Sequence, residues 1–220
     1  MKILCVETSS NICGVAVLEN TNLIKKIELD SGLTHSETLM PIIQQILENS
    51  NISLKDIDLL VCDIGPGSFT GLRIGIATIK AFADSLDIPT IGISSLELLA
   101  YNIKEEGLIC STIDCRNNNC YFALYEYKNG SYKIIEEPSA KSDDEVIDLL
   151  KSIYPNTKIN YIGNGLETKS TDFKINVENL GIAGYKKFIH NNNLGEEILP
   201  LYLKKPQAER LLEQKLLENK

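Results

Sequence analysis

Two acidic residues stand where they could take part in phosphate chemistry. Glu7 and Asp114 each end an apolar, strand-like run, and a polar turn follows each of them. Carboxylates in such positions can hold a magnesium ion or orient a water molecule. Their neighbours Thr8 and Arg116 would then lie close to a bound nucleotide. The glycines that would let a phosphate approach the backbone are absent after both carboxylates, so an ATP-hydrolysing site is kept as an alternative.

A second candidate is the loop Gly65-Pro-Gly-Ser68, which separates an apolar strand from a helix. Free N–H groups and the helix dipole attract anions at a helix N-terminus, so this loop could cradle a phosphate. It lacks the Lys-Ser/Thr of a P-loop and the G-x-G-x-x-G of a dinucleotide site. A tight turn between strand and helix is therefore the favoured interpretation, with Ser68 as the helix cap.

The histidines and the two candidate cysteines lack the neighbours that a metal site or a catalytic nucleophile needs. His35 has no histidine, cysteine or carboxylate partner at ligand spacing, so we predict no metal and a polar role at a helix start. His190 stands alone in an Asn-rich region and is expected on the surface. Cys115 and Cys120 lack a paired histidine that would activate a thiolate. Neither a Ser/His/Asp set nor a zinc motif of a protease occurs.

The composition indicates a cytoplasmic protein. A chain of 220 residues forms one large or two small domains and needs no disulfide or metal to fold. Its six cysteines lie mostly in apolar runs without a C-x-x-C pair, which indicates reduced thiols. We expect no signal peptide and no membrane span. The net charge of −8 disfavours independent tight binding of RNA or DNA, which could still be contacted through a basic partner protein.

Three strand-like runs open the chain, and alternating helices and strands follow them. The first three runs predict an antiparallel meander over residues 2–8, 13–19 and 23–29. Capping boxes at 34–37 and 94–97, together with Ser68, predict the starts of three helices. Strands are predicted between them, at 59–64 and 90–93. A meander followed by this alternation gives a mixed sheet with helices on its faces, in the order of a ribonuclease H-like unit.

The predicted helix over 69–85 is apolar or small around most of its circumference. Its charged residues fall on one narrow stripe: Arg73, Lys80 and Asp84. Each glycine inside a helix destabilises it by about 1 kcal/mol relative to alanine, so Gly71 and Gly75 need a reason. The usual reason is a second backbone that passes too close for a side chain. We infer that one neighbour is the chain's own sheet and the other a second protein. Arg73 would pair with a carboxylate such as Asp63 or reach that protein.

A weaker repeat of the pattern begins near residue 108. Strand-like runs at 108–114, 120–127 and 132–135 are followed by a helix capped by Ser142 and a strand at 159–163. Thereafter we predict a helix over 182–191, an extended segment at 199–203 and a closing helix over 207–218. The chain is thus predicted to form two ribonuclease H-like lobes, 1–104 and a degenerate 105–199, with a C-terminal helix at about 200–220 joining the first.

Two such lobes are the plan of the actin, sugar kinase and heat-shock chaperone superfamily. A closer resemblance lies in six segments: Val6-Glu-Thr-Ser, Thr34-His-Ser-Glu-Thr-Leu-Met-Pro, Gly65-Pro-Gly-Ser-Phe-Thr-Gly-Leu-Arg-Ile-Gly, Ile91-Gly-Ile-Ser-Ser-Leu-Glu, Ile113-Asp-Cys-Arg and Pro200-Leu-Tyr-Leu. They resemble the TsaB (YeaZ) family of bacterial tRNA threonylcarbamoyladenosine biosynthesis proteins. The match is dense over residues 1–102 and sparse after about residue 125.

The resemblance implies an accessory subunit without catalysis of its own. In that family the chain pairs with the related catalytic subunit TsaD. With the ATPase TsaE, the pair places a threonylcarbamoyl group on N6 of adenosine 37, in tRNAs that read codons beginning with A. The resemblance implies no cofactor for this chain, with ATP or ADP and a metal in the partner subunits. Alone, the chain is expected to homodimerise.

The family's pairing surface is a bundle formed by its first two helices, which correspond here to residues 35–48 and 70–83. Ten residues are predicted to form this interface: His35, Leu39, Met40, Ile43, Gly71, Leu72, Gly75, Thr78, Ile79 and Phe82. The alternative from a different functional class is a weak ATP-binding or ATP-hydrolysing enzyme of the same fold. A homodimeric structural protein without a catalytic partner is a third possibility.

Overall fold

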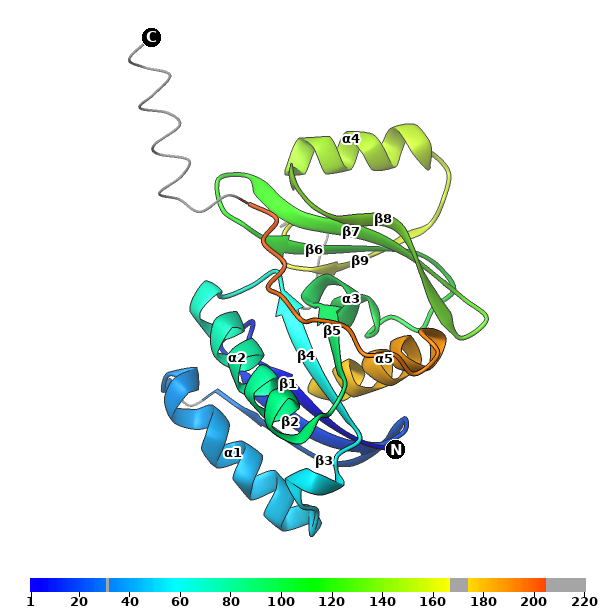
Figure 1. Cartoon of the computed structure of the whole chain (residues 1–220). Helices are drawn as coiled ribbons and strands as arrows, with labels where there is room; N and C mark the ends of the chain where they lie inside the picture. The colour runs from blue at the N-terminus through cyan, green and yellow to red at the C-terminus, as the bar shows by residue number, and fades with distance from the viewer. Residues whose placement is uncertain (31, 167–173, 205–220) are drawn as a thin grey trace.

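The computed structural model describes residues 1–30, 32–166 and 174–204. Two β-sheets lie one above the other, with helices between them and on their outer faces (Figure 1). The molecule is the pair of ribonuclease H-like lobes that the order of elements predicts. Among the described residues, no helix has the length and apolar character needed to cross a membrane.

The first sheet has the order β3-β2-β1-β4-β5. Its strands are β1 (Lys2–Glu7), β2 (Cys13–Glu19), β3 (Asn22–Leu29), β4 (Leu59–Gly65) and β5 (Thr90–Ser94). The first three pair antiparallel, and β4 joins β1 and β5 in parallel. The central strands are buried on both faces, which explains their almost continuous apolar sequence.

Helices α1 (His35–Ser50) and α2 (Phe69–Leu86) cover the outer face of this sheet. The predicted capping box of α1 is present, because Thr34 and Glu37 satisfy each other's backbone N–H groups. Ser68 caps α2 by accepting a hydrogen bond from Gly71 N at 3.2 Å. A short 3-10 helix, η1 (Leu54–Asp56), precedes β4.

The second sheet repeats the first with the order β8-β7-β6-β9. It consists of β6 (Gly107–Asp114), β7 (Asn119–Lys128), β8 (Ser131–Ser142) and β9 (Ile159–Gly163). Within the described ranges this sheet has no counterpart of β5, so the second lobe is the degenerate one. Helix α4 (Asp143–Ile153) covers its outer face, capped by Ser142 as predicted.

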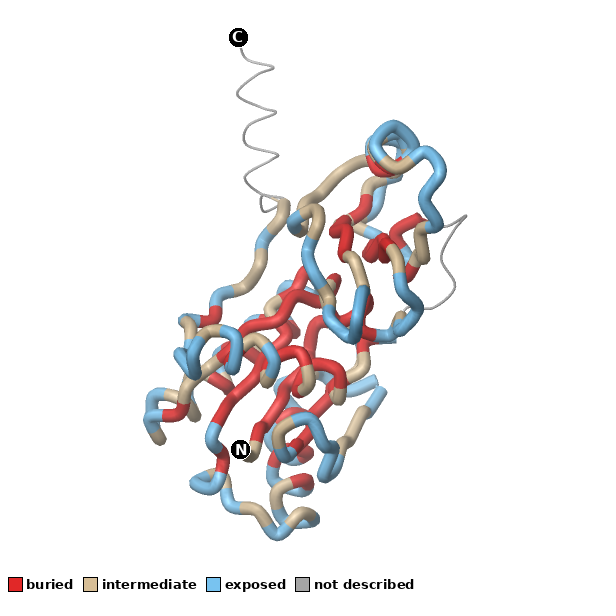
Figure 2. The backbone as a smooth tube through the Cα atoms, turned by 90° about the vertical axis from the view of Figure 1, so that its right-hand side faces the viewer, coloured by how far each residue is buried: buried red, intermediate tan, exposed pale blue. Residues whose placement is uncertain are grey.

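At the junction of the lobes, one helix from each lobe packs against the sheet of the other. Helix α3 (Ser95–Ala100) follows β5 but packs against the second sheet, whereas α5 (Val177–His190) packs against β1 and β2 of the first. One apolar cluster therefore runs through both lobes, and Figure 2 shows its buried backbone in the middle of the molecule. The predicted second lobe, 105–199, includes α5 in sequence, but α5 packs against the sheet of the first lobe.

After α5 the chain returns over the first lobe as an extended segment, residues 194–204. Glu196 N donates to Thr90 O and Leu201 N donates to Ile64 O, both at 2.8 Å. The extended segment predicted at 199–203 is thus confirmed, whereas residues 200–204 are not part of the C-terminal helix that was predicted from about residue 200. The helix predicted over 207–218 lies outside the described residues.

Candidate functional site

Gly71 and Gly75 are explained by the chain's own fold and not by a second protein. A Cβ at Gly71 would collide with the carbonyl oxygen of Thr8, and one at Gly75 would collide with Thr8 Oγ1. Thr8 Oγ1 also donates to Gly71 O at 2.8 Å. The backbone that passes close to α2 is therefore the end of β1. The inference that these glycines lack an intramolecular reason was wrong.

Six of the ten residues predicted for a partner interface are buried inside this chain. They are Leu39, Ile43, Gly71, Leu72, Gly75 and Ile79. Met40 is half exposed, whereas His35, Thr78 and Phe82 are partly buried. The interface itself remains a prediction, and the structure limits which side chains could reach a partner.

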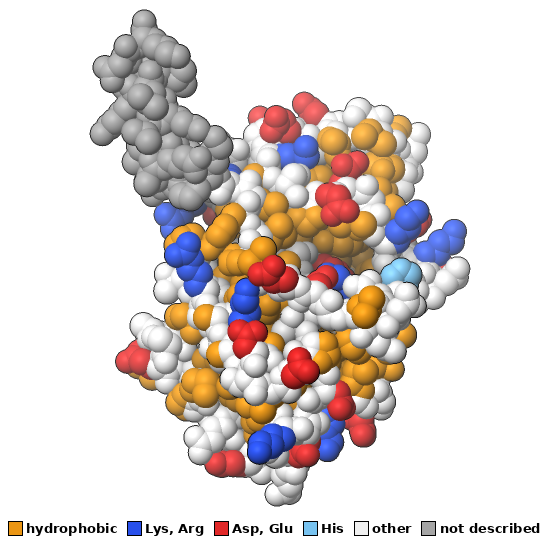
Figure 3. All heavy atoms as spheres, in the orientation of Figure 1, with side chains coloured by type: hydrophobic (Ala, Val, Ile, Leu, Met, Phe, Trp, Pro, Cys, Tyr) orange, Lys and Arg blue, Asp and Glu red, His pale blue; other side chains and the backbone are white. Residues whose placement is uncertain are grey.

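Part of the accessible surface of the two helices is small and apolar, although α1 also exposes polar side chains such as Glu37, Gln44 and Glu48. Ala77 and Ala81 are exposed on α2, and Ile74 is partly buried next to them. Together with Met40, Thr78 and Phe82 these residues form what we call the α1–α2 face. Figure 3 shows hydrophobic side chains gathered over these helices. Apolar surface of this kind commonly marks a site of protein–protein contact.

Arg73 lies outside the α1–α2 face and does not pair with Asp63, while its predicted contact with a second protein stays a prediction. Its Nε donates to the Tyr202 hydroxyl at 2.9 Å, and its guanidinium carbon lies 3.8 Å from the centre of the Phe69 ring. Phe69 and Tyr202 stack with their centroids 5.4 Å apart. Arg73 therefore holds the extended segment 194–204 against α2, and its predicted pairing with Asp63 was wrong.

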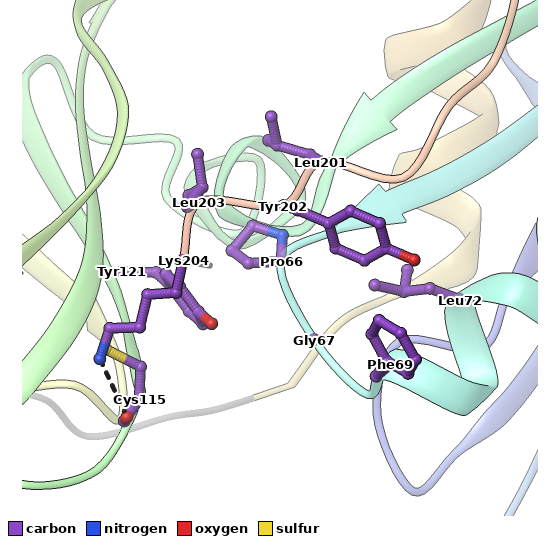
Figure 4. A pocket seen from close by; sticks show the side chains of 10 residues that line it. All are labelled: Pro66, Gly67, Phe69, Leu72, Cys115, Tyr121, Leu201, Tyr202, Leu203 and Lys204. Carbon is purple, nitrogen blue, oxygen red and sulfur yellow. Dashed lines mark hydrogen bonds between the residues drawn. The ribbon is translucent and has the colours of Figure 1, made fainter. Parts of the chain in front are cut away.

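The Gly65–Ser68 loop is a tight turn packed against β1. Ser68 N donates to Ser9 O at 2.7 Å, and a Cβ at Gly67 would collide with the same Ser9. A mostly apolar pocket of about 210 Å³ opens beside this loop, between Phe69, Tyr202 and Tyr121 (Figure 4). Because small-molecule sites usually measure about 300–1,000 Å³, this pocket is too small for a nucleotide.

Glu7 and Asp63 form a buried pair of carboxylates beneath that loop. Glu7 accepts hydrogen bonds from Ser9 N at 2.6 Å and Ser9 Oγ at 2.7 Å. Asp63 accepts from Gly65 N at 2.7 Å and Ser95 Oγ at 2.8 Å. Burial, followed by the charge of Asp63, raises the pKa of Glu7 to about 8, and burial raises the pKa of Asp63 to about 6. Both carboxylates are enclosed by the protein.

The structure does not bring the four predicted nucleotide-proximal residues together. Asp114 and Arg116 line a cavity of about 540 Å³ in the second lobe, which neither Glu7 nor Thr8 lines. Asp114 Oδ1 accepts from Arg116 N at 2.8 Å. Glu7 and Thr8 are buried in the first lobe. The geometry therefore gives no support to an ATP site built from these residues.

His35 has the helix-start position predicted for it. It is the first residue of α1, and its Nε2 donates to Ser10 O at 2.8 Å because a carbonyl can only accept. Across the described residues, no group of three or more His, Cys, Asp or Glu side chains is arranged to hold a metal ion.

Both the sequence and the two-lobed fold are similar to those of known proteins. A family model described as "TsaD: tRNA N6-adenosine threonylcarbamoyltransferase" matches residues 30–213. Proteins named "tRNA threonylcarbamoyladenosine biosynthesis protein TsaB" are 39% identical over 131 residues in Bacillus subtilis and 33% identical over 150 residues in Escherichia coli. The chain belongs to the TsaB family. These alignments cover 59% and 67% of this chain, and 57% and 64% of the two TsaB relatives.

A solved TsaB-family structure has the same fold. YeaZ from Pseudomonas aeruginosa superposes with a TM-score of 0.76 at 23% identity, covering 92% of this chain and 99% of YeaZ. The residues that sequence reasoning missed are Ile74, Ala77 and Ala81. Their signal was present in the helical periodicity, because they lie opposite the buried positions Leu72, Ile76 and Ile79 of α2.

Proposed function

We propose that this chain is a non-catalytic subunit of the machinery that attaches a threonylcarbamoyl group to N6 of adenosine 37 in tRNA. In this proposal it binds and supports a TsaD-type catalytic subunit, and the TsaE-type ATPase acts on the pair. The names of the TsaB relatives and the match to the TsaD family model support a place in this pathway. The chain would contact tRNA only through the complex, because its net charge is −8.

The α1–α2 face is the observation that carries the proposal. Met40 of α1 exposes 50% of its surface, and α2 exposes the small side chains of Ala77 and Ala81. Small residues let a partner helix approach closely, and the flanking Phe82 supplies apolar area to bury. A related subunit with a similar pair of helices could form a four-helix contact here. The same face would support a homodimer when the partner is absent.

Complementation of cells depleted of their own copy tests the proposal against the ATPase alternative. Ala77→Arg adds a bulky charge to the α1–α2 face, and Ser152→Arg on the exposed surface of α4 is its matched control. Asp114→Asn removes the exposed carboxylate on which the ATPase alternative depends. We expect wild type, Ser152→Arg and Asp114→Asn to restore the modified nucleoside, measured by mass spectrometry of digested tRNA, and Ala77→Arg to fail. Failure of Asp114→Asn with rescue by Ala77→Arg would favour the enzyme.

The substitution Gly75→Leu is unsuitable for this test. Gly75 faces Thr8 inside the chain, so a leucine would disturb the fold before any partner could sense it.

A further inference from the structure

A cavity at the junction of the lobes has no place in the proposed function. It measures about 390 Å³ and lies between Glu97 and Tyr101 of the α3 region, Lys186 and His190 of α5, and Tyr132 of β8. This volume falls within the range of small-molecule sites. It is separate from the α1–α2 face, which lies on the other side of the first sheet.

Glu97 is the unusual group in this cavity. The Ser94–Glu97 segment was predicted to form a capping box, and Ser94 Oγ does accept from Glu97 N at 3.1 Å. The Glu97 carboxylate does not accept a hydrogen bond from Ser94 N, as a capping box requires. It accepts no hydrogen bond from any other described residue either. It lies instead among the residues that line the cavity. Burial raises its pKa to about 7, Lys187 lowers it, and Glu196 and Glu137 raise it.

A carboxylate without a partner in a partly dry site favours a ligand that supplies a cationic hydrogen-bond donor. Lys187 also lines the cavity and its charge lowers the pKa of Glu97, but its Nζ donates to Glu196 Oε1 at 2.6 Å and Gly92 O at 2.9 Å and not to Glu97. Lys187 is therefore held in the wall of the cavity. The ammonium group of a ligand can donate directly to Glu97.

The lining of the same cavity also carries positive charge and an apolar surface. Lys186 Nζ lies at the rim, 5.8 Å from the centre of the Tyr101 ring, with one bond to Gly130 O at 3.3 Å. His190 stands beside it. The rings of Tyr101 and Tyr132 stack 4.1 Å apart and form an apolar side of the cavity. On the face in Figure 3, acidic and basic side chains lie beside apolar ones at this junction.

We propose that this cavity binds a small zwitterion, an α-amino acid with an apolar side chain. Its ammonium group donates to the Glu97 carboxylate, its carboxylate meets Lys186 and His190 at the rim, and its side chain lies against Tyr101 and Tyr132. A ligand with only one charge would leave either Glu97 or the basic rim unpaired, and that makes a zwitterion the best match to the cavity.

Isothermal titration of the full-length chain with L-leucine and L-phenylalanine tests the proposal. N-acetyl-L-leucine lacks the ammonium charge and L-leucine methyl ester lacks the carboxylate, so we expect both to bind at least about tenfold more weakly than L-leucine. Glu97→Gln and Lys186→Met should each weaken L-leucine about tenfold or more. The controls are Glu105→Gln and Lys133→Met, which change exposed residues outside the cavity and should bind like wild type.

Two results would overturn the proposal. One is the absence of measurable binding of either amino acid to the wild-type chain at about 10 mM. The other is L-leucine binding that Glu97→Gln and Lys186→Met leave unchanged, which would place the ligand elsewhere. Circular dichroism of each variant shows whether it is folded, and Lys186→Met keeps the test valid if Glu97→Gln does not fold, because Lys186 is exposed.

Discussion

Replacement of Glu7 by Gln should remove much of the pH dependence of this chain's stability. Glu7 is 1% exposed, and its pKa is raised from 4.5 to about 8 in the folded protein. A carboxyl group with a raised folded pKa stabilises the fold most below its unfolded pKa, and this stability is lost as the pH rises through the folded value. At about 1.36 kcal/mol per pKa unit, the Glu7 contribution falls by about 3.5 kcal/mol between pH 5 and pH 8.

Gln imitates the protonated form of Glu7, because its amide oxygen can still accept the bonds from Ser9. Urea unfolding followed by far-UV circular dichroism at pH 5, 6, 7 and 8 measures the effect. We expect the wild-type free energy of unfolding to fall across this range and the Glu7→Gln value to fall by about 3 kcal/mol less. Asp63, with a folded pKa of about 6, and Glu97, with a folded pKa of about 7, account for the remaining decrease.

Glu19→Gln at the exposed end of β2 is the matched control, and it should follow the wild-type curve. The reasoning is refuted if wild type and Glu7→Gln lose stability in parallel from pH 5 to pH 8. That result would mean that Glu7 is ionised in the folded protein without loss of stability. Glu7 would then not be the protonated member of the buried pair of carboxylates.

Three further substitutions test local contacts by urea unfolding. Gly75→Ala should cost about 1–3 kcal/mol, because its Cβ would collide with Thr8; an unchanged midpoint would contradict the close approach. Tyr202→Phe should cost about 1 kcal/mol by removing the acceptor of the Arg73 hydrogen bond, and equal stability would show that this bond is not maintained in solution. Ser142→Ala should cost about 1 kcal/mol through loss of the α4 cap, unless the capping box is absent.

Local elements and their starts could be predicted from the sequence. The capping boxes at Thr34 and Ser142 and the cap at Ser68 all start helices where their residue types predict. The strands of both sheets follow from apolar runs that turn residues interrupt. These features depend on residues close together in the chain, which is why local pattern is sufficient to find them.

The contacts that define the site depend on distant segments and could not be predicted in the same way. Periodicity shows that Gly71 and Gly75 share a face of α2, but it cannot say that Thr8, directly after β1, passes there. The pairing of Arg73 with Tyr202 spans 129 residues. The exchange of α3 and α5 between the lobes likewise reflects packing across the whole molecule. Local sequence pattern therefore located the two helices, but it could not show that six of the ten residues predicted for the interface are buried inside the chain.

Direct binding of the purified chain to the TsaD-type subunit from the same genome tests the central claim most directly. Isothermal titration would compare wild type, Ala77→Arg and the α4 control Ser152→Arg. The account predicts a saturable complex for wild type and Ser152→Arg, and at least a tenfold loss of affinity for Ala77→Arg with its stability unchanged. A wild-type chain that does not bind the catalytic subunit would contradict the accessory role, and undiminished binding by Ala77→Arg would contradict the α1–α2 face.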